Sequence, residues 1–496
     1  MRMLVLLFAM LVTGMNDTET VRVFLVGDST MADKPLIDNP EHGWGQMIPA
    51  FFSRDVVFIN RAKNGRSTRS FLLEGRWDSV MTAMHPGDYV FIQFGHNDSK
   101  KEDTSRFADA KGEYKKNLLR FVSDVRRKNG IPVLITPVNR RNFDPLGRFV
   151  DKHGEYPDVV RDVAVKENVP LVDLHARSKV FFSALGDERS KELFLLSVRP
   201  NSYAALPNGK NDNTHFTRKG ARAVAKLVTE EIERIGLPLK SALLQSDEIP
   251  PPLEGITVGL DQFYNNERKI LKDSSAVRFH YTWDDSADSG FLELAKIFDR
   301  HGADIDTLNS APTELGLKKF SIYIIVDPDT PKETVQPNYL QSVEIDVIER
   351  WVKKGGFLVL LANDKGNSEF LHFNQLAERF GIRFNEDMHQ DVKNNQYDSG
   401  RVTQFPAHPM FRTVKHAFIK QFSSITTVPP AQPVLMTRGV TAIAEARIGA
   451  GRGIAVGDPW LYNEYIDNRR LPAGYENEEA ANGFVRWICS QAQKVR

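Results

Sequence analysis

The chain has 496 residues, of which 41% are hydrophobic and 26% are charged, a composition typical of folded proteins rather than disordered ones. The formal net charge of +1 provides no strong field to attract nucleic acid or an anionic membrane surface, so neither is expected as a partner. The single cysteine, Cys489, excludes an intramolecular disulfide and a cysteine-based zinc site, and the length predicts two or three domains.

Residues 1–20 have the pattern of a secretory signal peptide. Arg2 precedes an apolar run over residues 3–12, and small and polar residues follow it. The run is too short to span a membrane comfortably, and a short buried strand or helix is the alternative interpretation. The pattern predicts a secreted or periplasmic protein that has no membrane association after cleavage.

Residues 21–243 alternate between strand-like and helix-like patterns. The apolar runs that predict strands lie at 22–27, 56–60, 89–94, 131–138 and 170–174. Helical spacing of apolar residues occurs over 114–128 and over 217–235, where Thr217 is the expected N-cap. Strands that alternate with helices predict a parallel sheet covered on both faces, with functional residues at the carboxyl ends of the strands.

Residues 244–255 include three consecutive prolines in polar company, which predicts an extended linker. The alternation then restarts over 256–496, so a second α/β domain is expected. Its strand-like runs lie at 256–260, 320–326, 357–362 and 453–456, and a helical pattern that contains Cys489 comes last.

The second domain resembles flavodoxin-like folds and class I glutamine amidotransferases in this alternation. Such amidotransferases need a cysteine after a central strand, whereas Asn363, Asp364 and Lys365 follow the run at 357–362. No amidotransferase activity is therefore expected, and Cys489 is interpreted as a core residue. Acidic, aromatic and amide groups over 457–468 could bind carbohydrate or the other domain, with loop packing as the alternative.

The first predicted strand, in the stretch RVFLVGDSTMAD, ends in a tight turn that presents Ser29. A serine hydroxyl needs a base, a group that orients the base, and donors for the oxyanion. Asp212 and His215 lie three residues apart just before the helix that Thr217 caps, so the carboxylate can reach Nδ1 and leave Nε2 for Ser29. The alternative is that both residues are structural, so that Ser29 caps a helix and His215 is a surface or capping residue.

Two other strand ends offer hydrogen-bond donors for an oxyanion. Gly65 follows the second predicted strand and can present its backbone N–H at close approach because it has no Cβ. Asn97 follows the third predicted strand and can offer its side-chain amide. The alternatives are that Gly65 only forms a turn and that Asn97 only caps a helix. Asp28 and Asp98 are interpreted as turn and scaffold residues, and His96 as a packed neighbour of Asn97.

Together these blocks make residues 21–240 resemble the SGNH (GDSL-like) hydrolases. The stretches GDSTMA, HGWGQMI, NGRSTRSFLLEGRW, YVFIQFGHND, TPVNRRNF and DNTHFTRKGA resemble in particular the rhamnogalacturonan acetylesterases. The resemblance implies a three-layer α/β/α sandwich in which Ser29 is the nucleophile, His215 the base and Asp212 its orienting group. It also implies an oxyanion hole made by the backbone N–H groups of Ser29 and Gly65 and the side chain of Asn97, with no cofactor and no metal.

The resemblance further implies an acetylated pectic polysaccharide or oligosaccharide as the substrate. Four arginines that follow predicted strands suit uronate carboxylates, namely Arg66, Arg69, Arg140 and Arg141. Trp44 and Phe143 could stack on sugar rings. The alternatives are that the arginines form structural ion pairs, that the substrate is a lipid, a thioester or acetylxylan, or that the domain only binds.

Overall fold

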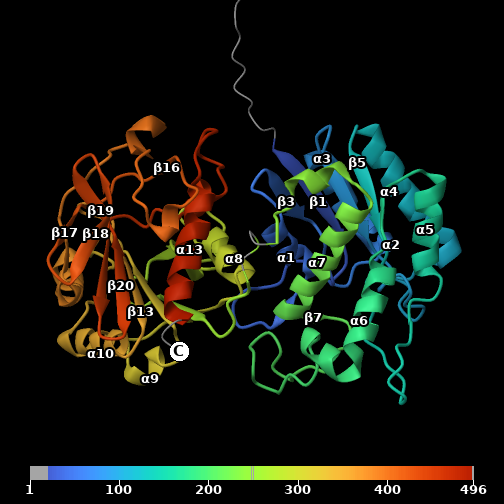
Figure 1. The fold of residues 1–496 in the computed structure, drawn as a ribbon, viewed down its shortest axis with the longest axis horizontal. Helices are drawn as coiled ribbons and strands as arrows, with labels where there is room; N and C mark the ends of the chain where they lie inside the picture. The colour runs from blue at the N-terminus through green and yellow to red at the C-terminus, as the bar shows by residue number, and fades with distance from the viewer. Residues whose placement is uncertain (1–19, 247–248, 250, 494–496) are drawn as a thin grey trace, which may run out of the picture.

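Two α/β domains lie side by side in the computed structural model (Figure 1). The structure describes residues 20–246, 249 and 251–493. The predicted signal segment, except for Thr20, lies outside the described residues.

A five-stranded parallel sheet, with strand order β3-β1-β4-β5-β6, forms the centre of the first domain. Its strands are β1 (Val21–Gly27), β3 (Val56–Asn60), β4 (Tyr89–Gln93), β5 (Ile131–Ile135) and β6 (Leu171–Val172). Every predicted strand is present, but the last two are shorter than expected. Pro137 has no N–H for the sheet, and the Asp173 side chain accepts a hydrogen bond from the Ala176 N–H as the N-cap of α6 (Leu174–Ser190).

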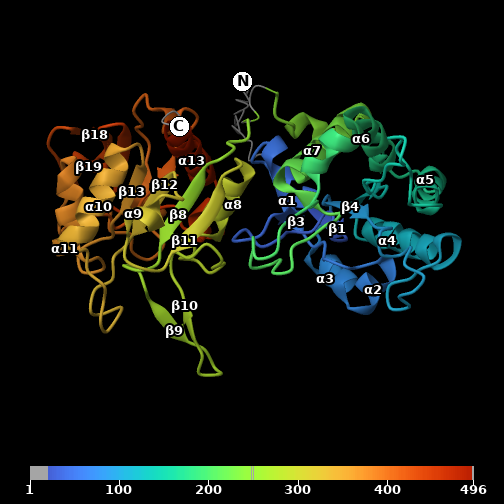
Figure 2. The ribbon, with the colours of Figure 1, turned by 90° about the horizontal axis from the view of Figure 1, so that it is seen from below.

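Helices cover both faces of this sheet, as a three-layer α/β/α sandwich requires (Figures 1 and 2). One face carries α1 (Trp44–Met47), α6 and α7 (Arg218–Arg234), and the other carries α2 (Thr68–Leu73), α3 (Arg76–Ala83), α4 (Lys115–Arg127) and α5 (Tyr156–Lys166). The predicted helices α4 and α7 are confirmed, and the Thr217 side chain caps α7 by accepting the Gly220 N–H at 3.2 Å. Short elements are η1 (Ile48–Phe51), η2 (Ala110–Tyr114), η3 (Lys191–Leu193), η4 (Pro238–Ala242) and the ribbon of β2 (Glu41–His42) with β7 (Phe216–Thr217).

The second domain contains a seven-stranded sheet of order β11-β8-β12-β13-β20-β19-β18. The strands are β8 (Thr257–Asp261), β11 (Asp304–Leu308), β12 (Ile322–Val326), β13 (Phe357–Leu361), β18 (Ala431–Thr437), β19 (Val440–Ile448) and β20 (Gly451–Val456). Its five parallel strands have the flavodoxin-like order 2-1-3-4-5, which is also the order in the first domain. The antiparallel strands β18 and β19 extend the sheet beyond the predicted pattern.

The helices of the second domain also lie on both faces of its sheet. They are α8 (Leu292–Arg300), α9 (Glu314–Leu317), α10 (Ser342–Lys353), α11 (Phe370–Ala377), α12 (Asn463–Ile466) and α13 (Asn477–Gln493). The smaller elements are β9 (Arg268–Ile270), β10 (Ala276–Arg278), β14 (Ile382–Phe384), β15 (Arg401–Val402), β16 (Ala417–Phe418), β17 (Ile425–Thr427), η5 (Glu378–Phe380), η6 (Tyr397–Gly400) and η7 (Pro409–Phe411). Cys489 is buried in α13, as predicted.

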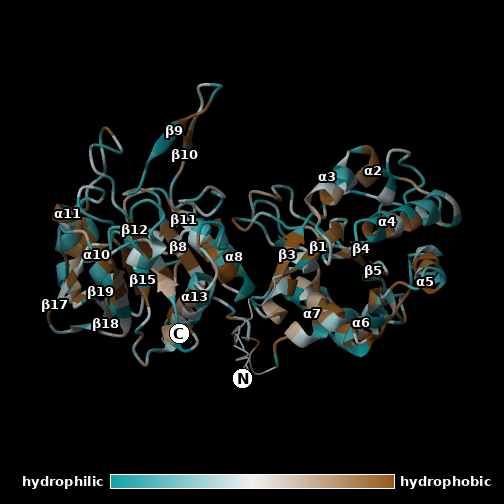
Figure 3. Ribbon diagram, turned by 90° about the horizontal axis from the view of Figure 1, so that it is seen from above, coloured by the Kyte–Doolittle hydropathy of each residue, from teal (hydrophilic) through white to brown (hydrophobic). Residues whose placement is uncertain are grey.

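Hydrophobic residues gather inside the two domains, and the surrounding loops are mostly hydrophilic (Figure 3). Helix α8 lies on the side of the second domain that faces the first (Figures 1 and 2). Across the described ranges, no helix is both long and apolar enough to cross a membrane.

Candidate active site

The predicted nucleophile and base meet at the carboxyl edge of the first sheet. Ser29 lies two residues after β1, and its Oγ is 2.8 Å from His215 Nε2, although the two residues are 186 positions apart in the chain. His215 directly precedes β7, whose pairing with β2 places the histidine beside the end of β1. Ser29 is 8% exposed, which leaves its hydroxyl at the edge of the protein surface.

Asp212 holds the imidazole from the other side. Its Oδ2 lies 2.6 Å from His215 Nδ1, and its Oδ1 accepts the backbone N–H groups of Thr214 at 2.7 Å and His215 at 3.1 Å. Burial by itself would raise the pKa of Asp212, but the bond to His215 and these backbone donors hold that pKa well below its usual range. The carboxylate is therefore ionised at neutral pH and favours the tautomer with the proton on Nδ1, in which Nε2 can accept a hydrogen bond from the Ser29 hydroxyl.

The two predicted oxyanion donors lie close to each other. Gly65 has a φ of +75°, a conformation that suits glycine and fits the tight turn after β3. The Asn97 side-chain amide donates to the carbonyl oxygen of Arg66, the next residue after Gly65, at 3.0 Å. This bond orients the amide and leaves its second N–H for another acceptor. The oxyanion role of Ser29, Gly65 and Asn97 remains a prediction.

Replacing Asn97 with alanine is expected to lower kcat by roughly 10²–10³, the usual cost of removing one oxyanion donor. The KM for a small acetyl ester should change much less, because the donor acts mainly on charge that develops in the transition state. Steady-state kinetics on a nitrophenyl acetate checks this. A kcat within threefold of the wild type, in a folded variant, would remove Asn97 from the oxyanion site.

The flanking polar residues have the structural roles expected of them. Asp28 Oδ1 accepts the Thr30 N–H at 3.0 Å, and Asp98 Oδ1 accepts the Thr68 N–H at 2.9 Å. Burial raises the pKa of both carboxyl groups, that of Asp98 to about 7. His96 is buried and its ring packs edge-on against His153.

Two of the predicted sugar-binding residues require correction. Trp44 is 0% exposed and its Nε1–H donates to Gln93 Oε1 at 2.8 Å, so its ring belongs to the core and cannot stack on a sugar. Arg141 is 9% exposed and its guanidinium donates to the Ser190 hydroxyl and to Asp187, so it is a structural residue. Both are satisfied by partners far away in the chain.

The other three predicted arginines remain candidates for binding substrate. Arg66 and Arg69 are partly exposed and pair with Glu74 at 3.0 Å and with Glu113 at 2.7 Å. Arg140 donates to the Thr214 hydroxyl at 3.0 Å and to the His96 carbonyl oxygen at 3.1 Å. Arg140 therefore also joins the loop of the base to the loop of Asn97.

A row of alternating charges behind Asp212 is not evident from the sequence. Lys210 Nζ lies 3.3 Å from Asp212 Oδ2 and 3.1 Å from Glu41 Oε2, and Glu41 Oε1 lies 2.7 Å from Lys34 Nζ. These contacts tie the Asp212 carboxylate to β2. Lys210 precedes Asp212 by two residues, but Lys34 and Glu41 come from the other end of the domain and have no local sequence signal.

Residues 457–466, most of the stretch over 457–468 in the second domain, are buried, and Asp467 and Asn468 are exposed. Trp460 and Tyr462 are buried, and the Asn463 amide donates to backbone carbonyls of Asp285 and Ala287 at 2.7 Å each. Loop packing, the alternative interpretation, therefore describes this stretch. Asp458 is fully buried beside Tyr462, whose hydroxyl donates to Asp458 Oδ1 at 2.9 Å.

Asp458 predicts a pH dependence of stability. Burial raises the pKa of Asp458 to about 8, far above its usual value of 3.8 in an unfolded chain. Between these values the unfolded chain releases a proton that the folded chain keeps, so the wild type should lose stability as the pH rises from 4 to 8. The slope from this group is at most about 1.4 kcal/mol per pH unit. Denaturant unfolding of the wild type and Asp458→Asn should give curves whose difference grows over this range, whereas a constant difference would contradict the prediction.

The fold and the site define a class of protein. A three-layer α/β/α domain that aligns a serine hydroxyl, an imidazole and an ionised carboxylate at the end of its first strand is a serine hydrolase. The model of the GDSL-like lipase/acylhydrolase family matches residues 25–223. The chain belongs to this family through its first domain, and it is a carboxylic ester hydrolase.

Three curated relatives align with the same half of the chain. Rhamnogalacturonan acetylesterase RhgT of Bacillus subtilis (strain 168) is 44% identical over 227 residues, which are 46% of this chain and 96% of RhgT. The probable rhamnogalacturonan acetylesterase YesY of the same strain is 35% identical over 223 residues, 45% of this chain and 97% of YesY. Rhamnogalacturonan acetylesterase of Emericella nidulans is 28% identical over 244 residues, 45% of this chain and 90% of that relative.

Proposed function

We propose that the first domain removes acetyl groups from rhamnogalacturonan, the galacturonate-containing backbone of pectin. The observation that carries the proposal is the contact of His215 with two residues. Its Nε2 lies 2.8 Å from Ser29 Oγ, and its Nδ1 lies 2.6 Å from Asp212 Oδ2. The substrate class is supported by the names of the relatives described above.

The reaction is a series of proton transfers between Ser29, His215 and the substrate. Ser29 Oγ attacks the acetyl carbonyl while its proton moves to His215 Nε2, and the oxyanion forms next to the predicted N–H donors. The imidazolium, stabilised by Asp212, then protonates the sugar oxygen as the C–O bond breaks. Water attacks the acetyl-serine with His215 as the base, and acetate and the free hydroxyl of Ser29 result.

Acetate release from a panel of polysaccharides tests the substrate class. The panel contains acetylated rhamnogalacturonan, acetylated homogalacturonan and acetylated xylan at equal acetyl content. Rhamnogalacturonan should give the highest kcat/KM. Equal or faster release from xylan, with Ser29→Ala inactive on both, would leave the serine mechanism intact and overturn the substrate assignment.

An esterase for longer acyl chains is the competing function. A site for a long acyl chain needs an apolar groove, whereas the loops that carry Gly65, Asn97 and His215 are rich in Arg, Asn and Asp, which favours a small acyl group on a polar alcohol. Comparison of nitrophenyl acetate with nitrophenyl octanoate separates the two. The acetyl ester should be hydrolysed at least tenfold more efficiently, and the reverse order would favour the lipase function.

Export of the protein is also proposed, on the signal-like pattern of residues 1–20. Extracellular or periplasmic polymer breakdown requires it. N-terminal sequencing of the protein from culture medium or periplasm should find a start near residue 20, and a cytoplasmic protein that retains Met1 would contradict export.

We further propose that the second domain positions the segment that carries His215, through contacts with the ribbon of β2 and β7. Asp299, at the end of α8, is 2% exposed and lies 2.8 Å from both His42 Nε2 and Arg218 Nε of the first domain. His42 lies in β2, and Arg218 begins α7 directly after β7, so one carboxylate of the second domain contacts one strand of the ribbon and the residue that follows the other strand. Arg218 also pairs with Asp304 of the second domain at 2.9 Å. Burial opposes ionisation of Asp299, but these two partners hold its pKa below its usual range.

The variant Asp299→Asn tests this role, because the amide cannot balance Arg218 and accept from His42 as the carboxylate does. A small displacement of His215 should lower kcat about tenfold to a hundredfold with little change in KM. Asp299→Glu should recover part of the loss. Arg54→Gln is the matched control, because Arg54 pairs with Glu476 across the same domain boundary at 3.0 Å but away from the ribbon. Equal kcat values in Asp299→Asn and Arg54→Gln would contradict the proposal.

A further inference from the structure

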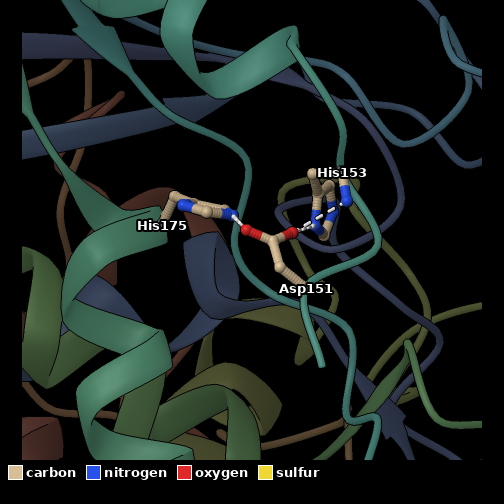
Figure 4. Close-up of side chains that lie close together, drawn as sticks. All are labelled: Asp151, His153 and His175. Carbon is tan, nitrogen blue, oxygen red and sulfur yellow. Dashed lines mark hydrogen bonds and ion pairs between the residues drawn. The ribbon is translucent and has the colours of Figure 1, made fainter. Parts of the chain in front are cut away.

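A cluster of potential metal ligands lies in the first domain and does not include Ser29, His215 or Asp212. It consists of Asp151 and His153, in the loop before α5, and His175, in the first turn of α6 (Figure 4). One potential ligand atom from each residue lies within 4.8 Å of the other two. Asp151 Oδ2 is 2.9 Å from His175 Nε2, and Asp151 Oδ1 is 3.8 Å from His153 Nδ1.

One histidine of this cluster is buried without hydrogen-bond partners for its ring nitrogens among the described residues. His153 is 3% exposed, and neither of its ring nitrogens has a hydrogen-bond partner among the described residues. The same is true within the described ranges for the neighbouring His96, whose ring centroid is 4.8 Å from that of His153. A buried nitrogen without a partner loses its hydration and gains nothing in return, so its presence calls for a ligand or another compensating role.

We propose that Asp151, His153 and His175 bind a divalent transition-metal ion, with zinc as the best fit. Two imidazoles and one carboxylate form a common zinc ligand set, which leaves a fourth position for water. Zinc ligands lie about 2 Å from the ion and hence up to about 4 Å from one another, so closing the cluster needs a movement of roughly 1 Å. The exposed carboxylate of Asp151 provides a route of entry from solvent.

The surroundings are compatible with a cation. Burial lowers the pKa of His153, which keeps its imidazole neutral and able to bind a metal at neutral pH. Arg161 Nη2 lies 3.3 Å from His175 Nδ1, and its charge is balanced by Asp173 at 2.9 Å and by Asp158 at 2.6 Å. Metal binding at His175 Nε2 would place a proton on Nδ1, so Arg161 should shift from that atom towards its two carboxylates.

The ion would join the loop before α5 to α6. His153 packs against His96, and His96 directly precedes Asn97. The bound ion would therefore also support the loop that carries Asn97, the predicted oxyanion donor. The ion is thus expected to stabilise the domain, and the serine chemistry needs no step through it. The inference does not depend on the identity of the ester substrate.

Metal titration of the full chain tests the inference. After dialysis against a chelator, isothermal titration and native mass spectrometry with Zn²⁺ should give one ion per chain. Co²⁺ in its place should produce visible absorption bands from a site with nitrogen and oxygen ligands. Zn²⁺ should also raise the Tm of the first domain by a few degrees, because an ion that binds only the folded state stabilises it.

Two variants and a matched control identify the ligands. Asp151→Asn and His153→Gln should each weaken zinc binding at least tenfold and abolish the increase in Tm. His372→Gln should change neither, although His372 also pairs with a carboxylate, that of Glu369 at 3.1 Å. Asp151→Asn replaces an exposed side chain, so it decides the question even where His153→Gln does not fold. A wild type that retains no zinc at micromolar concentration, or variants that bind as tightly as the wild type, would overturn the site.

Discussion

Replacing Ser29 with alanine is expected to lower kcat on an acetyl ester by about 10⁴–10⁶. The variant lacks the Ser29 Oγ, which lies 2.8 Å from His215 Nε2. Without this oxygen no acetyl-serine can form, so the route through a covalent intermediate is lost. Steady-state hydrolysis of nitrophenyl acetate and of acetylated rhamnogalacturonan, compared with the wild type, measures the effect. Both substrates should lose activity by a similar factor, because they share the acyl-enzyme step.

The alanine variant should fold like the wild type. Ser29 is small and lies at the surface edge of a turn that Asp28 stabilises through Thr30, so its removal leaves that turn intact. Near-identical circular dichroism and Tm values would therefore accompany the loss of activity. Esterase activity above one tenth of the wild-type value in this variant would refute Ser29 as the nucleophile.

Replacing Asp212 with asparagine is expected to lower kcat by roughly 10⁴ with little change of structure. The asparagine oxygen can still accept the backbone N–H groups that Asp212 Oδ1 accepts at 2.7 and 3.1 Å, so the turn should persist. Its amide group would donate to Nδ1 and hold the proton on Nε2, which is the wrong tautomer for a base facing Ser29. The kcat at pH 7 measures the loss.

Lys210→Met is the matched control for Asp212→Asn. It removes the other charged neighbour of Asp212 Oδ2, at 3.3 Å, but leaves the carboxylate and the imidazole tautomer in place. Its kcat should fall by less than about tenfold, since a partly exposed ion pair contributes little. Comparable kcat values for the two variants would show that Asp212 acts through the charge network rather than on the tautomer.

The features of the site that depend on nearby residues could be predicted from the sequence. The turn after β1 that presents Ser29 follows from an apolar strand that ends in Gly27 and Asp28. The Asp212–His215 contact spans three residues and is fixed by the backbone N–H groups of the same turn. The alternation of strands and helices then placed Ser29 at the carboxyl edge of a parallel sheet.

The features that depend on distant residues could not be predicted. Whether an arginine after a strand reaches solvent depends on its partners, and those of Arg141 lie on α6, 46 and 49 residues away. Trp44 packs in the hydrophobic core of the first domain, where Gln93, on β4, accepts its N–H. Lys34, Asp299 and the His153 cluster likewise depend on tertiary contacts that leave no periodic signal in the sequence.

The antiparallel strands β18 and β19 have only a weak local signal in the sequence. Arg438 and Gly439 join them with φ values of +50° and +84°, as a two-residue hairpin turn requires. The sequence at this turn is Arg-Gly rather than the more typical Asn-Gly or Asp-Gly. Alanines in β19 also weaken the alternating pattern that would otherwise indicate a strand.

Trapping the acyl-enzyme tests the central claim most directly. The wild type is mixed with nitrophenyl acetate, quenched in acid within milliseconds, and mapped by peptide mass spectrometry. A single acetyl group on Ser29, absent from the Ser29→Ala variant, is the expected result. Acetylation of a different residue at catalytic rates, or equal acetylation in the alanine variant, would contradict the account.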